Sequence, residues 1–272
     1  MASSETAAQL FTRLSARPLF QHLENRFFDS VTEKDKDLRG VEIFGEASSG
    51  KTEMVLHLII NTIIPKKWKH LEVGGRGLGV LLIDLDCKFP MIRFLCLLEK
   101  KLEHCISISN STEPGTGNII VKEFIDTCLQ RFFKLDCFST IELIVSLKAS
   151  ERFLEDNPEI FLLIIDNASS FYWSDNLSCG QSNQYVSVMI KILKDIIQNY
   201  GMVVVLTRSY EEKSKYSKQS AWWELCNYRY HLQRDTEFFN NKEASICVCS
   251  MLHPTHYKVK FTWTENGLKF LA

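Results

Sequence analysis

Residues 45–52 of the chain read GEASSGKT and constrain its fold more than any other stretch. They match the pattern GxxxxGK[ST]. The apolar run VEIF precedes them and the helical pattern EMVLHLIINTII follows. A strand, loop and helix in this order form the phosphate-binding loop of nucleoside triphosphatases, the P-loop. The alternative is a glycine turn that only caps a helix. In this context the motif predicts a site for a nucleoside triphosphate.

Each position of the motif has a physical role. Gly45 and Gly50 allow the backbone to curl so that its amide groups face the phosphates, and the N-terminus of the following helix adds unpaired donors. Lys51 brings a positive charge to the β- and γ-phosphates, and Thr52 offers its hydroxyl to Mg²⁺. We therefore predict ATP and Mg²⁺ as cofactors. The predicted nucleotide-binding residues are Gly45, Glu46, Ala47, Ser48, Ser49, Gly50, Lys51 and Thr52.

The stretch FLLIIDN at 161–167 offers a carboxylate for the metal ion. Its apolar residues indicate a buried strand, and Asp166 stands at the carboxyl end of that strand, where open α/β sheets bind their ligands. The alternative is an ordinary aspartate at the end of a strand. Beside a P-loop, Asp166 is predicted to hold the Mg²⁺ together with Thr52.

From residue 41 onward, apolar runs alternate with helical patterns. Strands are expected at 41–44, 80–84, 135–138, 161–165 and 202–206, and helices at about 52–64, 89–105, 140–156 and 186–200. Strands with little polar alternation, separated by helices, indicate a parallel sheet covered on both faces. The segments 244–251, 256–263 and 267–271 alternate as short antiparallel strands do. The prediction is one α/β P-loop NTPase domain over 41–272 with a mostly parallel sheet and a C-terminal β-meander.

Residues 1–40 are predicted to form an N-terminal arm ahead of this domain. Ala7, Leu10, Phe11 and Leu14 are spaced as one face of a short amphipathic helix. This face packs on the parent domain or docks on another chain, and the sequence leaves both open.

Composition excludes several classes of protein. The net charge of the 272 residues is −1, which argues against a generally basic nucleic-acid-binding protein. No window approaches the roughly 18 apolar residues of a membrane helix, and the N-terminus lacks the pattern of a secretion signal. We therefore expect an intracellular protein with no membrane partner. The nine cysteines include no CxxC pair and are expected to be reduced thiols.

The order of these parts resembles the core of the RecA-type recombinases. A P-loop strand is followed by strands ending LLIDLD and LLIID, then by MVVVLT, a loop and a meander, over about residues 40–272. The stretches GKTEM, IDLDCKFPMIRF and SSFYW resemble the eukaryotic recombinase paralogues. The resemblance implies an ATP-binding subunit of a heteromeric complex of recombinase paralogues in the nucleus. Such complexes assist assembly of the recombinase filament on single-stranded DNA during homologous recombination repair of double-strand breaks.

Two departures from the family fall on the hydrolysis machinery. The family has a glutamate that orients the attacking water, and here the motif IDLD puts Asp86 in its place. The family also has a glutamine that senses the γ-phosphate, and Ser209 stands there. The resemblance therefore implies at most a weak DNA-dependent ATPase, with Asp86 as the candidate catalytic residue. The alternatives are a free-standing DNA-dependent ATPase of the same fold and a P-loop enzyme of another class.

Two segments correspond to the DNA-contacting loops of the family. The first, at 173–184, contains no lysine or arginine. The second begins after Thr207 and interleaves basic residues with tyrosines, which suits contact with single-stranded or branched DNA. A solvated charged loop has a similar composition. The candidate DNA-binding residues are Arg208, Lys213, Lys215 and Lys218.

Overall fold

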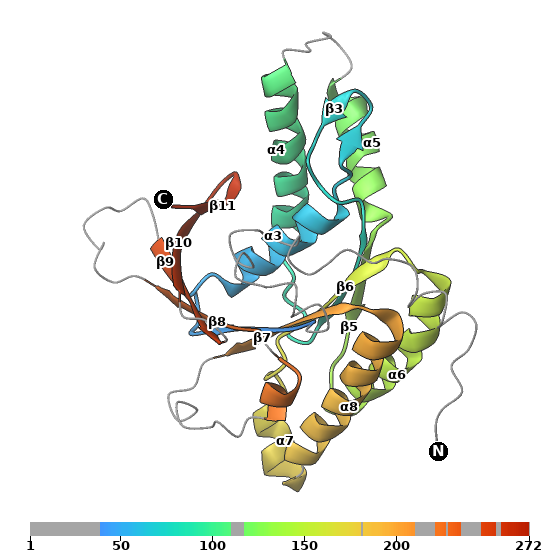
Figure 1. The fold of residues 1–272 in the computed structure, drawn as a ribbon, viewed down its shortest axis with the longest axis vertical. Coiled ribbons are helices and arrows are strands. Elements are labelled where there is room, and N and C mark those ends of the chain that lie inside the picture. The colour runs from blue at the N-terminus through green and yellow to red at the C-terminus, as the bar shows by residue number, and fades with distance from the viewer. Residues whose placement is uncertain are drawn as a thin grey trace.

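The computed structural model describes residues 39–109, 117–180, 182–209, 221–226, 228–234, 246–253 and 257–271. The predicted N-terminal arm and its amphipathic helix lie outside the described residues, apart from the last two positions of the arm. The described residues form one large sheet with helices on both of its faces (Figure 1). In this part of the chain no helix is both long and apolar enough to cross a bilayer.

Within the described ranges, the large sheet contains nine strands. In chain order these are β1 (Gly40–Gly45), β4 (Gly79–Asp84), β5 (Phe132–Asp136), β6 (Ile160–Asp166), β7 (Val203–Ser209), β8 (Tyr228–Arg234), β9 (Ile246–His253), β10 (Tyr257–Thr264) and β11 (Gly267–Phe270). Their order in space is β11-β10-β9-β8-β1-β7-β6-β4-β5. The strands from β8 to β5 run parallel, and β9, β10 and β11 are antiparallel. The predicted α/β class is confirmed, with its mostly parallel sheet and C-terminal meander.

Helices cover the two faces in separate layers (Figure 1). One face carries α3 (Lys51–Ile63), α4 (Met91–Ser109) and α5 (Gly117–Leu129), and the other carries α6 (Thr140–Asp156), α7 (Tyr172–Cys179) and α8 (Ser182–Tyr200). Alternate residues of each central strand enter opposite cores. In β6, Leu162 and Ile164 face the first layer while Leu163 and Ile165 face the second. This double burial explains why these strands are continuous apolar runs.

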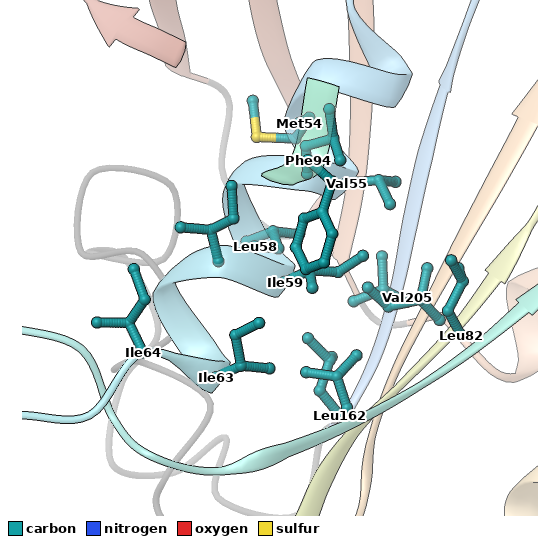
Figure 2. Packing of buried hydrophobic residues seen from close by; sticks show 14 of the residues in the cluster. Met54, Val55, Leu58, Ile59, Ile63, Ile64, Leu82, Phe94, Leu162 and Val205 are labelled. Carbon is teal, nitrogen blue, oxygen red and sulfur yellow. The ribbon is translucent and has the colours of Figure 1, made fainter. Parts of the chain in front are cut away.

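The helix that follows the P-loop is held by a fully buried apolar face. Figure 2 shows Ile59 and Ile63 of α3 directed toward Leu162 and Val205 of the sheet, with Phe94 of α4 beside them. The exposed fraction of each of these side chains is 0%. Because α3 begins at the P-loop, this packing fixes the loop against the sheet.

Strand β5 was predicted at 135–138 and lies at Phe132–Asp136 instead. It forms the end of the sheet beyond β4 and is only partly buried, and Lys134 lies in its middle. A polar residue inside a short edge strand breaks the apolar run on which the prediction depended. The predicted start of α6 is confirmed, since the Ser139 hydroxyl accepts a hydrogen bond from the Glu142 amide at 3.1 Å.

Several elements were not predicted. No element was predicted where helix α5 lies, and none where the short hairpin of β2 (Lys67–Trp68) and β3 (Leu71–Glu72) lies. Strand β8 was also missed, although its sequence carries a signal. Tyr228, Tyr230 and Leu232 alternate with polar residues and are fully buried, as one face of a strand requires.

Candidate nucleotide-binding site

The predicted P-loop connects the end of β1 to the start of α3. Glu46, Ala47 and Ser48 are exposed at its tip, while Ser49 and Gly50 are buried. Two residues adopt left-handed backbone conformations, Ser48 with φ 60° and Gly50 with φ 96°. Because such values favour glycine, Gly50 lets the chain turn directly into the helix.

The first glycine of the motif is required by close packing. A Cβ atom on Gly45 would lie 2.2 Å from the carbonyl oxygen of Leu232 in β8 and 2.6 Å from the Ser49 hydroxyl oxygen. Any larger residue would therefore push the loop away from β8. The glycine keeps the start of the loop within the sheet.

Lys51 folds back across the loop. Its Nζ donates hydrogen bonds to the carbonyl oxygens of Gly45 and Glu46, each at 2.7 Å. Burial lowers the pKa of Lys51, and the carboxylates of Asp166 and Asp86 oppose that shift. The ammonium group, the loop and the two carboxylates therefore belong to one site, although they come from three separate parts of the sequence.

Asp166 ends β6, and its register partner on the neighbouring strand β4 is Asp84. The Thr207 hydroxyl donates a hydrogen bond to its carboxylate. Burial raises the pKa of Asp166 and so do the carboxylates of Asp84 and Asp86, whereas the Thr207 hydrogen bond and Lys51 lower it. The carboxylates of Asp84 and Asp86 thus act on a partly desolvated Asp166, and a divalent cation beside Asp166 would offset that repulsion.

The residues present fit ATP with Mg²⁺. Thr52 is exposed on the first turn of α3, beside the amides at the helix N-terminus. Among the described residues, the Ser49 hydroxyl is one of few buried polar groups with no hydrogen-bond partner. The loop and Lys51 would hold the phosphates, and Thr52 and Asp166 would hold the metal ion. These roles remain predictions.

Asp86 and Ser209, the two departures from the family, lie at the same edge of the sheet. Asp86 is exposed just beyond β4, and its Oδ1 accepts a hydrogen bond from the Ser170 hydroxyl at 2.5 Å. Ser209 is the register partner of Gly45, and its hydroxyl accepts a hydrogen bond from the side-chain Nδ2 of Asn167 at 2.9 Å. Both side chains are therefore held by short polar residues that follow β6.

The prediction that 173–184 forms the first DNA-contacting loop is wrong, because most of this segment is helical. The segment Tyr172–Cys179 is helix α7, and α8 begins at Ser182. Gly180 separates the two helices with a left-handed backbone (φ 64°), and its amide bonds to the Asn176 carbonyl oxygen. The polar composition suggested a loop, but a glycine C-cap after one short helix explains the same sequence.

Arg208, the first DNA-binding candidate, lies near the end of β7 and forms an ion pair. Its Nη1 lies 2.6 Å from Oε1 of Glu42 on β1, and Arg229 of β8 bonds to the other oxygen of the same carboxylate. Glu42 is 1% exposed. The remaining candidates, Lys213, Lys215 and Lys218, lie outside the described residues. A DNA-binding role for all four stays a prediction.

The sequence did not indicate that the C-terminal meander reaches the P-loop. A Cβ atom on Gly50 would lie 2.9 Å from Cζ3 of Trp263 and 3.1 Å from Cε2 of Phe261, both on β10. The alternation of apolar residues predicted this strand, but alternation says nothing of what a strand will contact. No local signal could have found the contact.

The chain is similar to known DNA repair proteins, although no family model matches it. The DNA repair protein XRCC2 of Mus musculus is 31% identical over 210 residues, which cover 75% of this chain and 67% of the mouse protein. The XRCC2 homolog of Arabidopsis thaliana is 28% identical over 205 residues, 64% of this chain and 55% of that protein. The DNA repair protein RAD51 homolog 3 of Dictyostelium discoideum is 23% identical over 256 residues, 88% of this chain and 63% of that protein.

The fold and the loop define a P-loop protein with a RecA-like arrangement of strands. With the relatives above, the chain belongs to the RecA-type recombinase family, among its XRCC2-like DNA repair paralogues. As a RecA-family paralogue it has a role in DNA repair by homologous recombination.

Proposed function

We propose that this chain is the ATP-binding subunit of a heteromeric complex of recombinase paralogues, and that the complex assists assembly of the recombinase filament on single-stranded DNA. It would act in the nucleus, during repair of double-strand breaks. The observation that carries the proposal is the P-loop at the end of β1, with Lys51 folded across it, Asp166 at the carboxyl end of β6 and Asp86 just beyond β4 in the same sheet. These groups suit a bound ATP with Mg²⁺.

Within this function, ATP is held rather than rapidly hydrolysed. Hydrolysis needs a water held in line with the γ-phosphate, and the groups at the two corresponding positions are short. Asp86 is one methylene shorter than the family's glutamate, and Ser209 cannot reach where a glutamine would. A partner subunit could supply the missing groups in trans, as arginine fingers do in other P-loop proteins.

Exposed apolar side chains support the role of a subunit. Phe138, just before α6, and Ile141, in its first turn, are 70% and 61% exposed, and Leu177 of α7 is 85% exposed. A hydrogen bond from the Thr140 hydroxyl to Asp175 joins the beginnings of these two helices. Large apolar side chains exposed on neighbouring helices are typical of protein interfaces.

Co-expression with other recombinase paralogues is expected to yield a stable complex that contains this chain. A double substitution, Ile141→Asp with Leu177→Asp, should reduce the yield of that complex because it places charges among the exposed apolar groups. Ile92→Asp on α4 is the matched control, since Ile92 is 81% exposed on the other layer of helices. Size-exclusion chromatography of the co-purified chains measures the effect. A chain that stays monomeric with every paralogue tested would contradict the subunit role.

DNA binding by the chain alone is expected to be weak and strongly dependent on salt. Its net charge is −1, and the segment from Arg208 to Lys218 offers four basic residues. For single strands the log–log salt slope should therefore not exceed about 3 in magnitude. Fluorescence anisotropy with an oligonucleotide at several salt concentrations measures the slope, and a variant with Lys213, Lys215 and Lys218 replaced by alanine is the comparison. Tight binding that is insensitive to salt would contradict this expectation.

A further inference from the structure

The C-terminal hairpin of β10 and β11 lies directly against the P-loop. We propose that this hairpin is part of the nucleotide site and that Trp263 is a positioning residue, which holds the loop in its phosphate-binding conformation. The inference rests on the proposed ATP binding and adds a residue to that site from the opposite end of the chain.

The contact is made at the residue where α3 begins. Gly50 caps this helix with φ 96°, and an added Cβ would come within 3.3 Å of ring atoms of both Trp263 and Phe261. Phe261 is fully buried, and Trp263 is partly buried beside it in the same apolar core. The two rings therefore pack against Gly50 on the side where a Cβ would lie. The backbone amides next to Gly50 are the ones that would face the phosphates.

An arginine holds the hairpin in this position. Arg93 of α4 donates from Nε and Nη2 to the carboxylate of Glu53, both at 3.3 Å. Its Nη1 donates to the Glu265 carbonyl oxygen at 2.7 Å, in the turn that joins β10 to β11, two residues after Trp263. Glu53 lies in the first turn of α3. Arg93 thus ties the turn of the hairpin to the first turn of the helix that the P-loop opens.

Two further contacts join the same turn to α4. Lys100 of α4 forms an ion pair with Glu265 at 3.3 Å. A Cβ on Gly267 would lie 3.3 Å from a methyl group of Leu97, so the turn rests closely on α4. Trp263 is therefore held from the hairpin side, and the P-loop rests on it.

A loop that is already held in its binding conformation loses less entropy when it takes up phosphate, and affinity rises accordingly. Removing the indole ring of Trp263 would leave a gap behind Gly50 into which the loop can relax. The ring is also close enough to the loop for bound nucleotide to change its surroundings. Trp263 should therefore report on binding through its fluorescence as well as assist binding.

The test uses the full chain with Trp263→Ala, Trp263→Phe and the control Lys269→Ala, which removes an exposed side chain from the same hairpin. By calorimetry, Trp263→Ala should bind ATP with Mg²⁺ about tenfold more weakly than wild type. Trp263→Phe keeps an aromatic ring and should restore affinity to within about twofold. Lys269→Ala should match the wild type.

A second measurement separates positioning from a general loss of structure. Trp263 is one of five tryptophans, and the change in emission on adding ATP should be lost in Trp263→Phe although that variant still binds. If Trp263→Ala does not fold, the comparison of the emission change between wild type and Trp263→Phe becomes the test of the inference. Equal affinities in wild type and Trp263→Ala, or an emission change that persists in Trp263→Phe, would overturn the inference and leave ATP binding intact. A wild type that binds no ATP would instead refute the proposed function itself.

Discussion

Replacing Lys51 by alanine is expected to weaken binding of ATP with Mg²⁺ by about a hundredfold. The Lys51 ammonium lies across the P-loop, 2.7 Å from two of the loop's own carbonyl oxygens, and would turn to the phosphates when a nucleotide binds. A charge-assisted hydrogen bond to phosphate has no replacement in the variant. Calorimetry on the full chain measures the loss.

The control for this substitution is Lys66→Ala, which removes an exposed lysine beyond the end of α3 and should leave the affinity unchanged. Thermal unfolding should show that Lys51→Ala still folds, because burial already disfavours the charged ammonium and its loss removes that penalty. Equal affinities in wild type and Lys51→Ala would contradict the role given to residues 45–52.

Replacing Asp86 by glutamate is expected to raise the rate of hydrolysis of bound ATP by on the order of a hundredfold. The longer side chain would move the carboxylate by about 1 Å, and a misplacement of that size is enough to account for such a loss in the wild type. Asp86 is moreover held by the Ser170 hydroxyl at 2.5 Å, which directs it toward the segment after β6. Single-turnover hydrolysis, with chain in excess over ATP, measures the rate.

Two further variants sharpen this result. Asp86→Asn removes the base and should hydrolyse no faster than wild type. Ser209→Gln, added to Asp86→Glu, should raise the rate further, because Ser209 lies beside Gly45 at the start of the P-loop. If Asp86→Glu is no faster than wild type, the water-orienting residue lies elsewhere and Asp86 is only a carboxylate at the end of a strand.

The nucleotide site was predictable because its residues carry the chemistry in a contiguous motif. Gly45, Gly50 and Lys51 follow one another at a spacing that few other structures require, and Asp166 ends a run of apolar residues. The central strands were predictable for a related reason. Burial on both faces leaves a continuous apolar signal, as in β6, where successive residues enter opposite cores.

The rest depended on contacts that no local pattern encodes. Strand β5 lies at the edge of the sheet, where a polar residue such as Lys134 is tolerated. Because Lys134 interrupts the apolar run, the strand was predicted after it, at 135–138. Helix α7 is short and is followed by the C-cap Gly180, which made its sequence look like a loop. The packing of Trp263 on Gly50 joins residues at opposite ends of the chain, and only the folded sheet brings them together.

The most direct test of the account is to identify the nucleotide that the chain retains. The wild-type chain is loaded with ATP and Mg²⁺, incubated, passed through a desalting column, denatured, and its nucleotide is separated by ion-exchange chromatography. The account predicts mainly intact ATP in the wild type, mainly ADP in Asp86→Glu and little nucleotide in Lys51→Ala. A wild type that retains mainly ADP, or that retains no more nucleotide than Lys51→Ala, would contradict it.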